Sequence, residues 1–210
     1  MYRTAPTRQC LICHQELNQE TNLFYYLYHP SLCQQCIQQF EVLDQKLILQ
    51  RHPLHVLYHY NDFFRKILYQ YKALDDYVLK DAFFHSFPEL KRRYKDYIVV
   101  IIPSSQQDNI RRGFCPNEEL VKQFSHHIFT GLYKSKQYKQ TKQKDRSKIK
   151  HVLKIKDGFL LHGKKVLIFD DVMTSSYTVQ AAIGLVEPYH PQTIELLILA
   201  CPHIQSFLDK

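Results

Sequence analysis

The sequence predicts an α/β protein, with a parallel sheet flanked by helices and a small metal-binding knob in front of it. Three observations support this. Short apolar runs rich in strand formers alternate with stretches of helical periodicity, as is typical of sheets buried on both faces. Two Cys-x-x-Cys pairs lie near the N-terminus, and two adjacent aspartates follow one apolar run. At 210 residues, the chain is long enough for one sizeable core and a small appendage.

The composition limits the classes of function. The chain has 28 Lys and Arg against 20 Asp and Glu, a formal charge of +8, which favours a polyanionic partner or a phosphorylated ligand. No apolar run approaches the roughly 18 residues that span a bilayer, and residues 1–6 lack the apolar segment of a secretory signal. Paired cysteines of this kind suit a reducing compartment. We expect a cytoplasmic protein, which partners could hold at the inner face of the membrane.

The N-terminal knob is predicted from cysteine spacing. Nineteen residues separate the pair Cys10 and Cys13 from the pair Cys33 and Cys36. Each pair can present two thiolates from one tight turn, so the four cysteines predict a closed, structural Zn²⁺ site. A pair of disulfides is the less favoured alternative. A segment this small cannot bury a core of its own, so the metal would supply its folding energy.

The elements after the knob follow from periodicity. Apolar residues recur at helical spacing in 36–50 and predict a connecting helix, which gives a knob over 1–50 and a main domain over 51–210. Residues 54–60 alternate, as in an edge strand or a hairpin. Residues 61–87 again have helical spacing. Lys72 lies among aromatic residues there, an arrangement that suits either a nucleic-acid contact or a half-buried core.

Residues 97–103 form a second apolar run, and Ser104 and Ser105 follow it. At the carboxyl end of a parallel strand, this loop could hold a diphosphate on its backbone amides. Arg111 and Arg112 come next, before a helix that starts near residue 118. The two arginines could contact nucleic acid, clamp a phosphate or face solvent.

Residues 134–156 carry ten Lys or Arg and a single acid, Asp145. Such a block resists packing. It suits electrostatic capture of single-stranded DNA, a lid over a phosphorylated ligand, or a solvated surface loop. The candidate nucleic-acid contacts in it are Lys139, Lys142, Lys144, Arg146, Lys148 and Lys150.

Residues 164–178 are the most informative stretch. A buried strand over 166–169 stops at Asp170 and Asp171, and a hydroxyl-rich turn, Thr174, Ser175, Ser176, Tyr177 and Thr178, leads into a helix. The turn amides and helix dipole can hold a phosphate, and the carboxylates can take ribose hydroxyls directly or through Mg²⁺. An ordinary strand-to-helix turn is the alternative. A last apolar strand, 193–200, completes the sheet.

This stretch resembles the signature of type I phosphoribosyltransferases, which bind 5-phosphoribosyl 1-diphosphate (PRPP). The resemblance lies in Asp170, Asp171, Val172, Thr174 and Thr178. It implies a type I phosphoribosyltransferase-like sheet that binds PRPP with Mg²⁺. Ser176 replaces the glycine of the signature, a residue that permits positive φ and close approach of a phosphate.

Over nearly its full length, the chain resembles the ComF family of late competence proteins. Besides the cysteines and the acidic pair, the resemblance includes residues 60–63, 71–72, 112–114 and 141–143. It implies a role in natural transformation, with single-stranded DNA, a competence helicase and DNA-processing proteins as partners.

The departures from the family pattern bear on activity. Cys115-Pro116 replaces Asn-Gln, Pro103-Ser104-Ser105 replaces a Pro-Val-Pro type segment, and no nucleophile or general base is evident. Three hypotheses therefore stay open: a non-enzymatic DNA-uptake protein, a phosphoribosyltransferase acting on an unknown acceptor, and a module that senses PRPP.

Overall fold

The computed structural model describes residues 9–17, 31–135 and 153–204. Its centre is a six-stranded sheet with the strand order β1-β2-β8-β7-β3-β4. All neighbouring pairs from β2 to β4 are parallel, and only β1 runs antiparallel to its neighbour β2. The predicted α/β class and the parallel pairing of the three apolar runs are confirmed. The strands are β1 (Val42–Leu49), β2 (His52–His59), β3 (Tyr97–Ile101), β4 (Ile128–Phe129), β7 (Lys165–Val172) and β8 (Thr193–Cys201).

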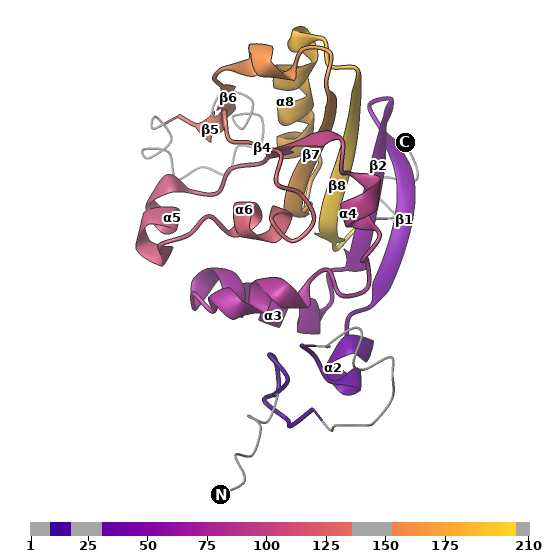
Figure 1. Cartoon of the computed structure of the whole chain (residues 1–210), viewed down its shortest axis with the longest axis vertical. Coiled ribbons are helices and arrows are strands. Elements are labelled where there is room, and N and C mark those ends of the chain that lie inside the picture. The colour runs from indigo at the N-terminus through magenta and orange to yellow at the C-terminus, as the bar shows by residue number, and fades with distance from the viewer. Residues whose placement is uncertain (1–8, 18–30, 136–152, 205–210) are drawn as a thin grey trace, which may run out of the picture.

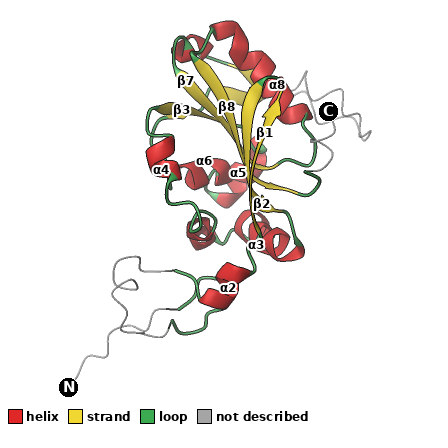
Figure 2. Cartoon of the chain, turned by 90° about the vertical axis from the view of Figure 1, so that its right-hand side faces the viewer, coloured by secondary structure: helices red, strands yellow, loops and turns green. Residues whose placement is uncertain are grey.

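Helices cover both faces of this sheet (Figure 2). Because successive strand residues point to opposite faces, β7 divides its apolar side chains between two cores. Leu167 and Phe169 pack with α3 (Asp62–Ala73), η1 (Tyr77–Ala82) and α6 (Pro116–Val121). Val166 and Ile168 pack on the other face, with α8 (Tyr177–Val186) and the separate antiparallel pair formed by β5 and β6. The remaining elements are α2 (Gln34–Gln38), α4 (Leu90–Arg93), α5 (Gln106–Arg112), β5 (Leu132–Lys134), β6 (Leu153–Ile155), η4 (Gly158–Leu161) and η5 (Glu187–Tyr189).

The helix predicted over 36–50 is wrong beyond its first residues. Helix α2 ends at Gln38, and Val42–Leu49 forms β1, the antiparallel edge strand of the sheet. Leu43 and Leu47 are four residues apart, a spacing that places them on one face of a strand as well as of a helix. The hairpin considered for residues 54–60 is confirmed, with β1 as its other strand. The domain boundary at residue 50 stays a prediction, and the place of β1 in the sheet favours one nearer residue 41.

Residues 9–17 and helix α2 lie at one end of the molecule, on the side of α3 (Figure 1). Cys10, Cys36 and Phe40 belong to the same hydrophobic cluster as Phe64 of α3, so the knob shares a core with the sheet domain. Residues 23–28, an apolar and aromatic run that predicts a short strand within the knob, lie outside the described residues. None of the helices described is long and apolar enough to cross a membrane.

Candidate ligand-binding site and metal centre

The acidic pair lies where several parallel strands end. Strand β7 continues through Asp170 and Asp171 to Val172, beyond the end expected at Phe169. The chain after β3 stays next to it, because the Ile102 amide donates to the Phe169 carbonyl at 3.0 Å. The loops after β3 and β7 therefore meet at the carboxyl edge of the sheet, the edge at which open α/β sheets bind ligands.

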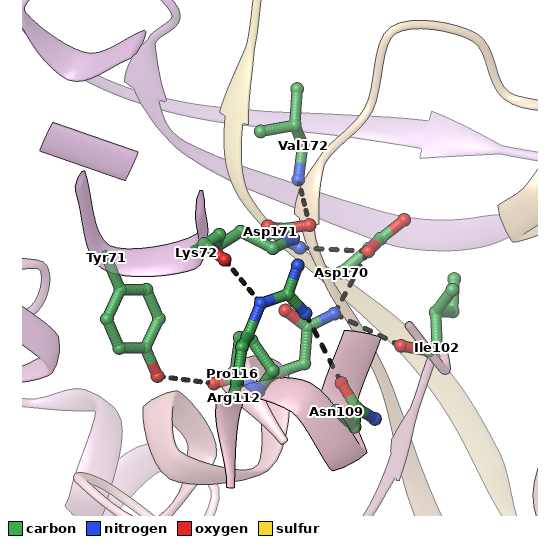
Figure 3. Close-up of polar contacts among 10 residues, drawn as sticks. Tyr71, Lys72, Ile102, Asn109, Arg112, Pro116, Asp170, Asp171 and Val172 are labelled. Carbon is green, nitrogen blue, oxygen red and sulfur yellow. Dashed lines mark hydrogen bonds and ion pairs between the residues drawn. The ribbon is translucent and has the colours of Figure 1, made fainter. Parts of the chain in front are cut away.

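Asp171 forms an ion pair with Lys72, which α3 presents from its last turn (Figure 3). The other carboxylate oxygen of Asp171 accepts from the Val172 amide at 3.0 Å, and the residue is only 5% exposed. Burial disfavours the carboxylate form, but the Lys72 ammonium outweighs burial and holds the pKa of Asp171 below its usual range. The same pairing raises the pKa of Lys72 against the effect of its own burial.

Asp170 has a different environment. Its Oδ1 accepts from the Asn117 amide group at 3.2 Å and from the Asp171 backbone amide at 3.0 Å. Burial, together with the neighbouring charge of Asp171, raises the pKa of Asp170 well above its usual range. The two carboxyl groups are thus unlike, one ionised against a lysine and the other biased toward its neutral form. This separation of pKa values is a frequent property of functional sites.

Asn117 is a residue of this site that sequence reasoning did not single out. It is 2% exposed, and its Nδ2 also donates to the Ile102 carbonyl at 3.1 Å, so it links the loop after β3 to Asp170. Its Oδ1 is buried without a hydrogen-bond partner. A buried polar atom without a partner is costly and therefore points to a rearrangement or a bound group.

Arg112 holds the end of α3. Its Nε donates to the Lys72 carbonyl, its Nη1 donates to Asn109 at 3.4 Å, and its side chain is only 10% exposed. These contacts disfavour Arg112 as a contact to nucleic acid, and the alternative that it faces solvent is wrong. Nearby, the Tyr71 hydroxyl donates to the Pro116 carbonyl at 2.9 Å and fixes α3 against α6.

Arg111 is accessible, but it is paired with Asp75 through Nη1 at 2.9 Å and Nη2 at 3.3 Å. Its contact to nucleic acid stays a prediction, and any phosphate would have to compete with Asp75. The basic candidates from Lys139 to Lys150 lie outside the described residues.

The turn from β7 into α8 has the predicted strand–loop–helix form. Thr174 and Tyr177 are exposed, and Ser175, Ser176 and Thr178 are half-buried. Ser176 stands before α8 at φ −75° and accepts from the Gln180 side chain at 2.8 Å. This position therefore does not need the positive φ that the glycine of the signature would permit.

In the loop after β3, Ser104 is half-buried and Ser105 is exposed. The Ser105 hydroxyl accepts from the Asp108 amide at 3.5 Å and caps α5. Together with the turn after β7, the two serines place hydroxyl groups at the same edge of the sheet as the acidic pair. Their role in binding a ligand stays a prediction.

The four cysteines of the knob are close together. Their Sγ atoms lie within 4.8 Å of one another, and all four thiols are free of disulfides. Tetrahedral coordination with Zn–S bonds of about 2.3 Å would separate the sulfurs by about 3.8 Å, so the cluster fits a metal ion. Burial alone would raise the pKa of Cys10, but hydrogen bonds from the Cys13, Cys33 and Ile12 amides lower it to about 6. The predicted cluster is therefore confirmed as a group that could hold a metal.

Comparison with known proteins agrees with this architecture. Residues 110–208 match the phosphoribosyl transferase domain family. The chain is also 28% identical, over 134 residues, to competence protein ComFC of Streptococcus pneumoniae. The chain is thus similar to a ComFC-type competence protein, and residues 110–208 of it match a phosphoribosyl transferase domain. This match covers 62% of the chain and 60% of the length of the relative, and it confirms the resemblance predicted from the motifs.

Proposed function

We propose that the protein acts in DNA uptake during natural transformation, where it binds single-stranded DNA on the cytoplasmic side. The similarity to a competence protein is the observation that carries this proposal. The net charge of +8 supports it, since phosphate neutralisation supplies most non-specific affinity for DNA. A competence helicase and DNA-processing proteins are the partners we propose.

The DNA-binding part is tested by reversing charge in the basic segment. The variant carries Glu at Lys142, Lys144, Arg146 and Lys148. It should lose both single-stranded DNA binding and transformation, with the larger binding defect at low salt because the contacts are electrostatic. A control with the same total charge change carries Glu at four exposed positions elsewhere, Lys91, Arg92, Lys95 and Lys164. Equal losses in both variants would mean that net charge alone, and not this segment, binds DNA.

A second candidate function is the binding of a phosphorylated ribose such as PRPP, for sensing or for transfer to an unknown acceptor. The unlike carboxyl groups at the edge of the sheet favour it, because a purely structural turn has no need of two adjacent acids, one buried and one half-buried. In this proposal, the acidic pair takes the ribose hydroxyls and residues 174–178 hold the 5-phosphate. Ser104 and Ser105 then contact the diphosphate.

Calorimetric titration with PRPP tests this second function, with Mg²⁺ supplied for the diphosphate. Micromolar binding that disappears in an Asp170→Asn, Asp171→Asn variant would support it. The circular dichroism of the variant should stay that of the wild type. An absence of heat and of any thermal shift would mean that the motif is a remnant of the fold.

We also propose that the metal of the cysteine cluster is a structural Zn²⁺. Four thiolates fill a tetrahedral shell and leave no open position, which suits a structural site. Elemental analysis should find about one zinc per chain. Cys10→Ser with Cys13→Ser should remove it, whereas Cys115→Ser, outside the cluster, should not. A metal-free wild type with its normal fold would contradict the proposal.

A further inference from the structure

The acidic pair is already occupied by groups of the protein. The Lys72 ammonium contacts Asp171 Oδ2, and the Val172 amide donates to Asp171 Oδ1. Asp170 Oδ1 accepts two further N–H groups, from Asn117 and from the Asp171 backbone. Mg²⁺ demands near-octahedral oxygen coordination at about 2.0–2.1 Å. Three of the four carboxylate oxygens have these partners, and only Asp170 Oδ2 has no hydrogen bond to the described residues. A single open oxygen beside an ammonium does not fit the near-octahedral Mg²⁺ that the sequence led us to expect at the pair.

The charge of the groups around the acidic pair also disfavours a divalent cation there. Lys72 neutralises the charge of Asp171, so the cluster has less net negative charge than two unpaired carboxylates. A divalent cation at the pair would also meet the ammonium at close range, in a site shielded from water. The Lys72 side chain is only 25% exposed, its ammonium is paired with Asp171, and Arg112 fixes its backbone by binding the Lys72 carbonyl.

We infer that the Lys72 ammonium takes the place of a divalent cation at the Asp170–Asp171 pair. The pair then binds ribose hydroxyls without metal: the carboxyl groups accept from them, and the ammonium donates to a hydroxyl oxygen. This inference rests on the second proposed function, ribose phosphate binding. Lys72 lies outside residues 110–208, so the cation comes from a part of the chain that the phosphoribosyl transferase match does not include.

Titration with Mn²⁺ alone tests the role of Lys72, with free Mn²⁺ followed by electron paramagnetic resonance. Wild type should bind Mn²⁺ at the pair only weakly, with no effect of Asp171→Asn. Lys72→Met keeps the apolar stem and removes the charge, and it should bind Mn²⁺ at least about tenfold more tightly. In the double variant Lys72→Met, Asp171→Asn, the gain in Mn²⁺ affinity should disappear. Lys66→Met, an exposed change on the same helix, should behave as wild type.

Two outcomes would overturn the inference. The first is a Mn²⁺ site in wild type that Asp171→Asn removes. The second is a folded Lys72→Met variant whose Mn²⁺ affinity is unchanged, since Lys72 would then not be what keeps the cation out. If Lys72→Met fails to fold, the Mn²⁺ titrations of the wild type and of the Asp171→Asn variant decide whether the pair binds a divalent cation.

Ribose 5-phosphate separates this inference from the function on which it rests, because it lacks the diphosphate that itself binds Mg²⁺. Wild type should bind it equally well with Mg²⁺ and in buffer depleted of divalent ions by a chelating resin. Lys72→Met should bind it more weakly and depend on Mg²⁺. A wild type that requires Mg²⁺ would overturn the inference. If neither ribose 5-phosphate nor PRPP binds in any condition, the ribose function fails, while the Mn²⁺ result still settles the role of Lys72.

Discussion

At the scale of single residues, the two adjacent carboxyl groups have opposite effects on stability. The folded pKa of Asp171 is lowered, so its contribution is present above its unfolded pKa of about 3.9 and is lost as the pH falls through the folded value. The folded pKa of Asp170 is raised. Above about pH 3.9 the unfolded state releases this proton while the folded state keeps it, so stability falls as the pH rises.

Asparagine substitutions should therefore shift stability in opposite directions. Asp170→Asn imitates the neutral acid and keeps the acceptor for Asn117, so it should raise the melting temperature at pH 8 and do so less at pH 4. Asp171→Asn leaves Lys72 without its counter-charge and should cost about 1–3 kcal/mol at pH 8. Thermal denaturation of both variants at the two pH values checks this. Losses of similar size at pH 8 would show that the two groups are equivalent.

The acidic pair itself could be predicted, because both aspartates directly follow an apolar run. Its partners could not. Lys72 is 99 residues from Asp171 in the chain, and Asn117 is 53 residues from Asp170, so only the fold brings them together. Among the aromatic residues of α3, Lys72 suited either a nucleic-acid contact or a half-buried core, and neither interpretation pairs it with an acid. Cys115-Pro116 drew attention to the residues just before Asn117, but no local pattern connects an asparagine with an acid on a distant strand.

At the scale of elements, the buried strands were predictable and the edge strand was not. Strands β3, β7 and β8 are continuous apolar runs, because helices or the β5–β6 ribbon cover each of their faces. Strand β1 has an alternating, half-exposed pattern, and its leucines match helical spacing by coincidence. The antiparallel position of β1 follows from its pairing with β2, a tertiary property that the periodicity of residues 36–50 does not contain.

The start of α3 offers a prediction at this scale. Asn61 accepts from the Phe64 amide at 2.8 Å, and its Nδ2 donates to Glu41 at 2.8 Å and to the Gln39 carbonyl at 3.2 Å. It therefore caps the helix and ties it to the chain between α2 and β1. Asn61→Ala should cost about 1–2 kcal/mol, which a urea denaturation midpoint will report.

Asn61→Asp separates the two roles of this residue. It keeps the acceptor for Phe64, loses both donated hydrogen bonds and places a negative charge beside Glu41. We expect a loss of stability smaller than that of Asn61→Ala. A loss as large as in the alanine variant would assign the effect to the tie with residues 39–41, and no loss in either variant would show that the cap is unimportant.

At the scale of the whole molecule, the four-cysteine knob and the sheet domain share one hydrophobic cluster. Cys10, Leu32, Cys36 and Phe40 are all buried in the cluster that contains Phe64 and Phe83. The Phe40 ring lies 6.0 Å from that of Phe64 and 6.4 Å from that of Phe83, both edge-on. Ordering of the knob by a metal should therefore add to the stability of the domain behind it, because the same side chains belong to both.

Removing the metal should accordingly lower the melting temperature of the whole chain and not only loosen its N-terminus. In the Cys10→Ser, Cys13→Ser variant, we expect one calorimetric transition, lowered by at least about 4 °C, since 1 kcal/mol shifts a domain of this size by about 2–4 °C. Cys115→Ser should keep its metal, and its transition should shift by less. A main transition at the wild-type temperature in the metal-free variant would show that the knob is an independent unit. The contacts of Phe40 with Phe64 and Phe83 would then contribute little to the stability of the sheet domain.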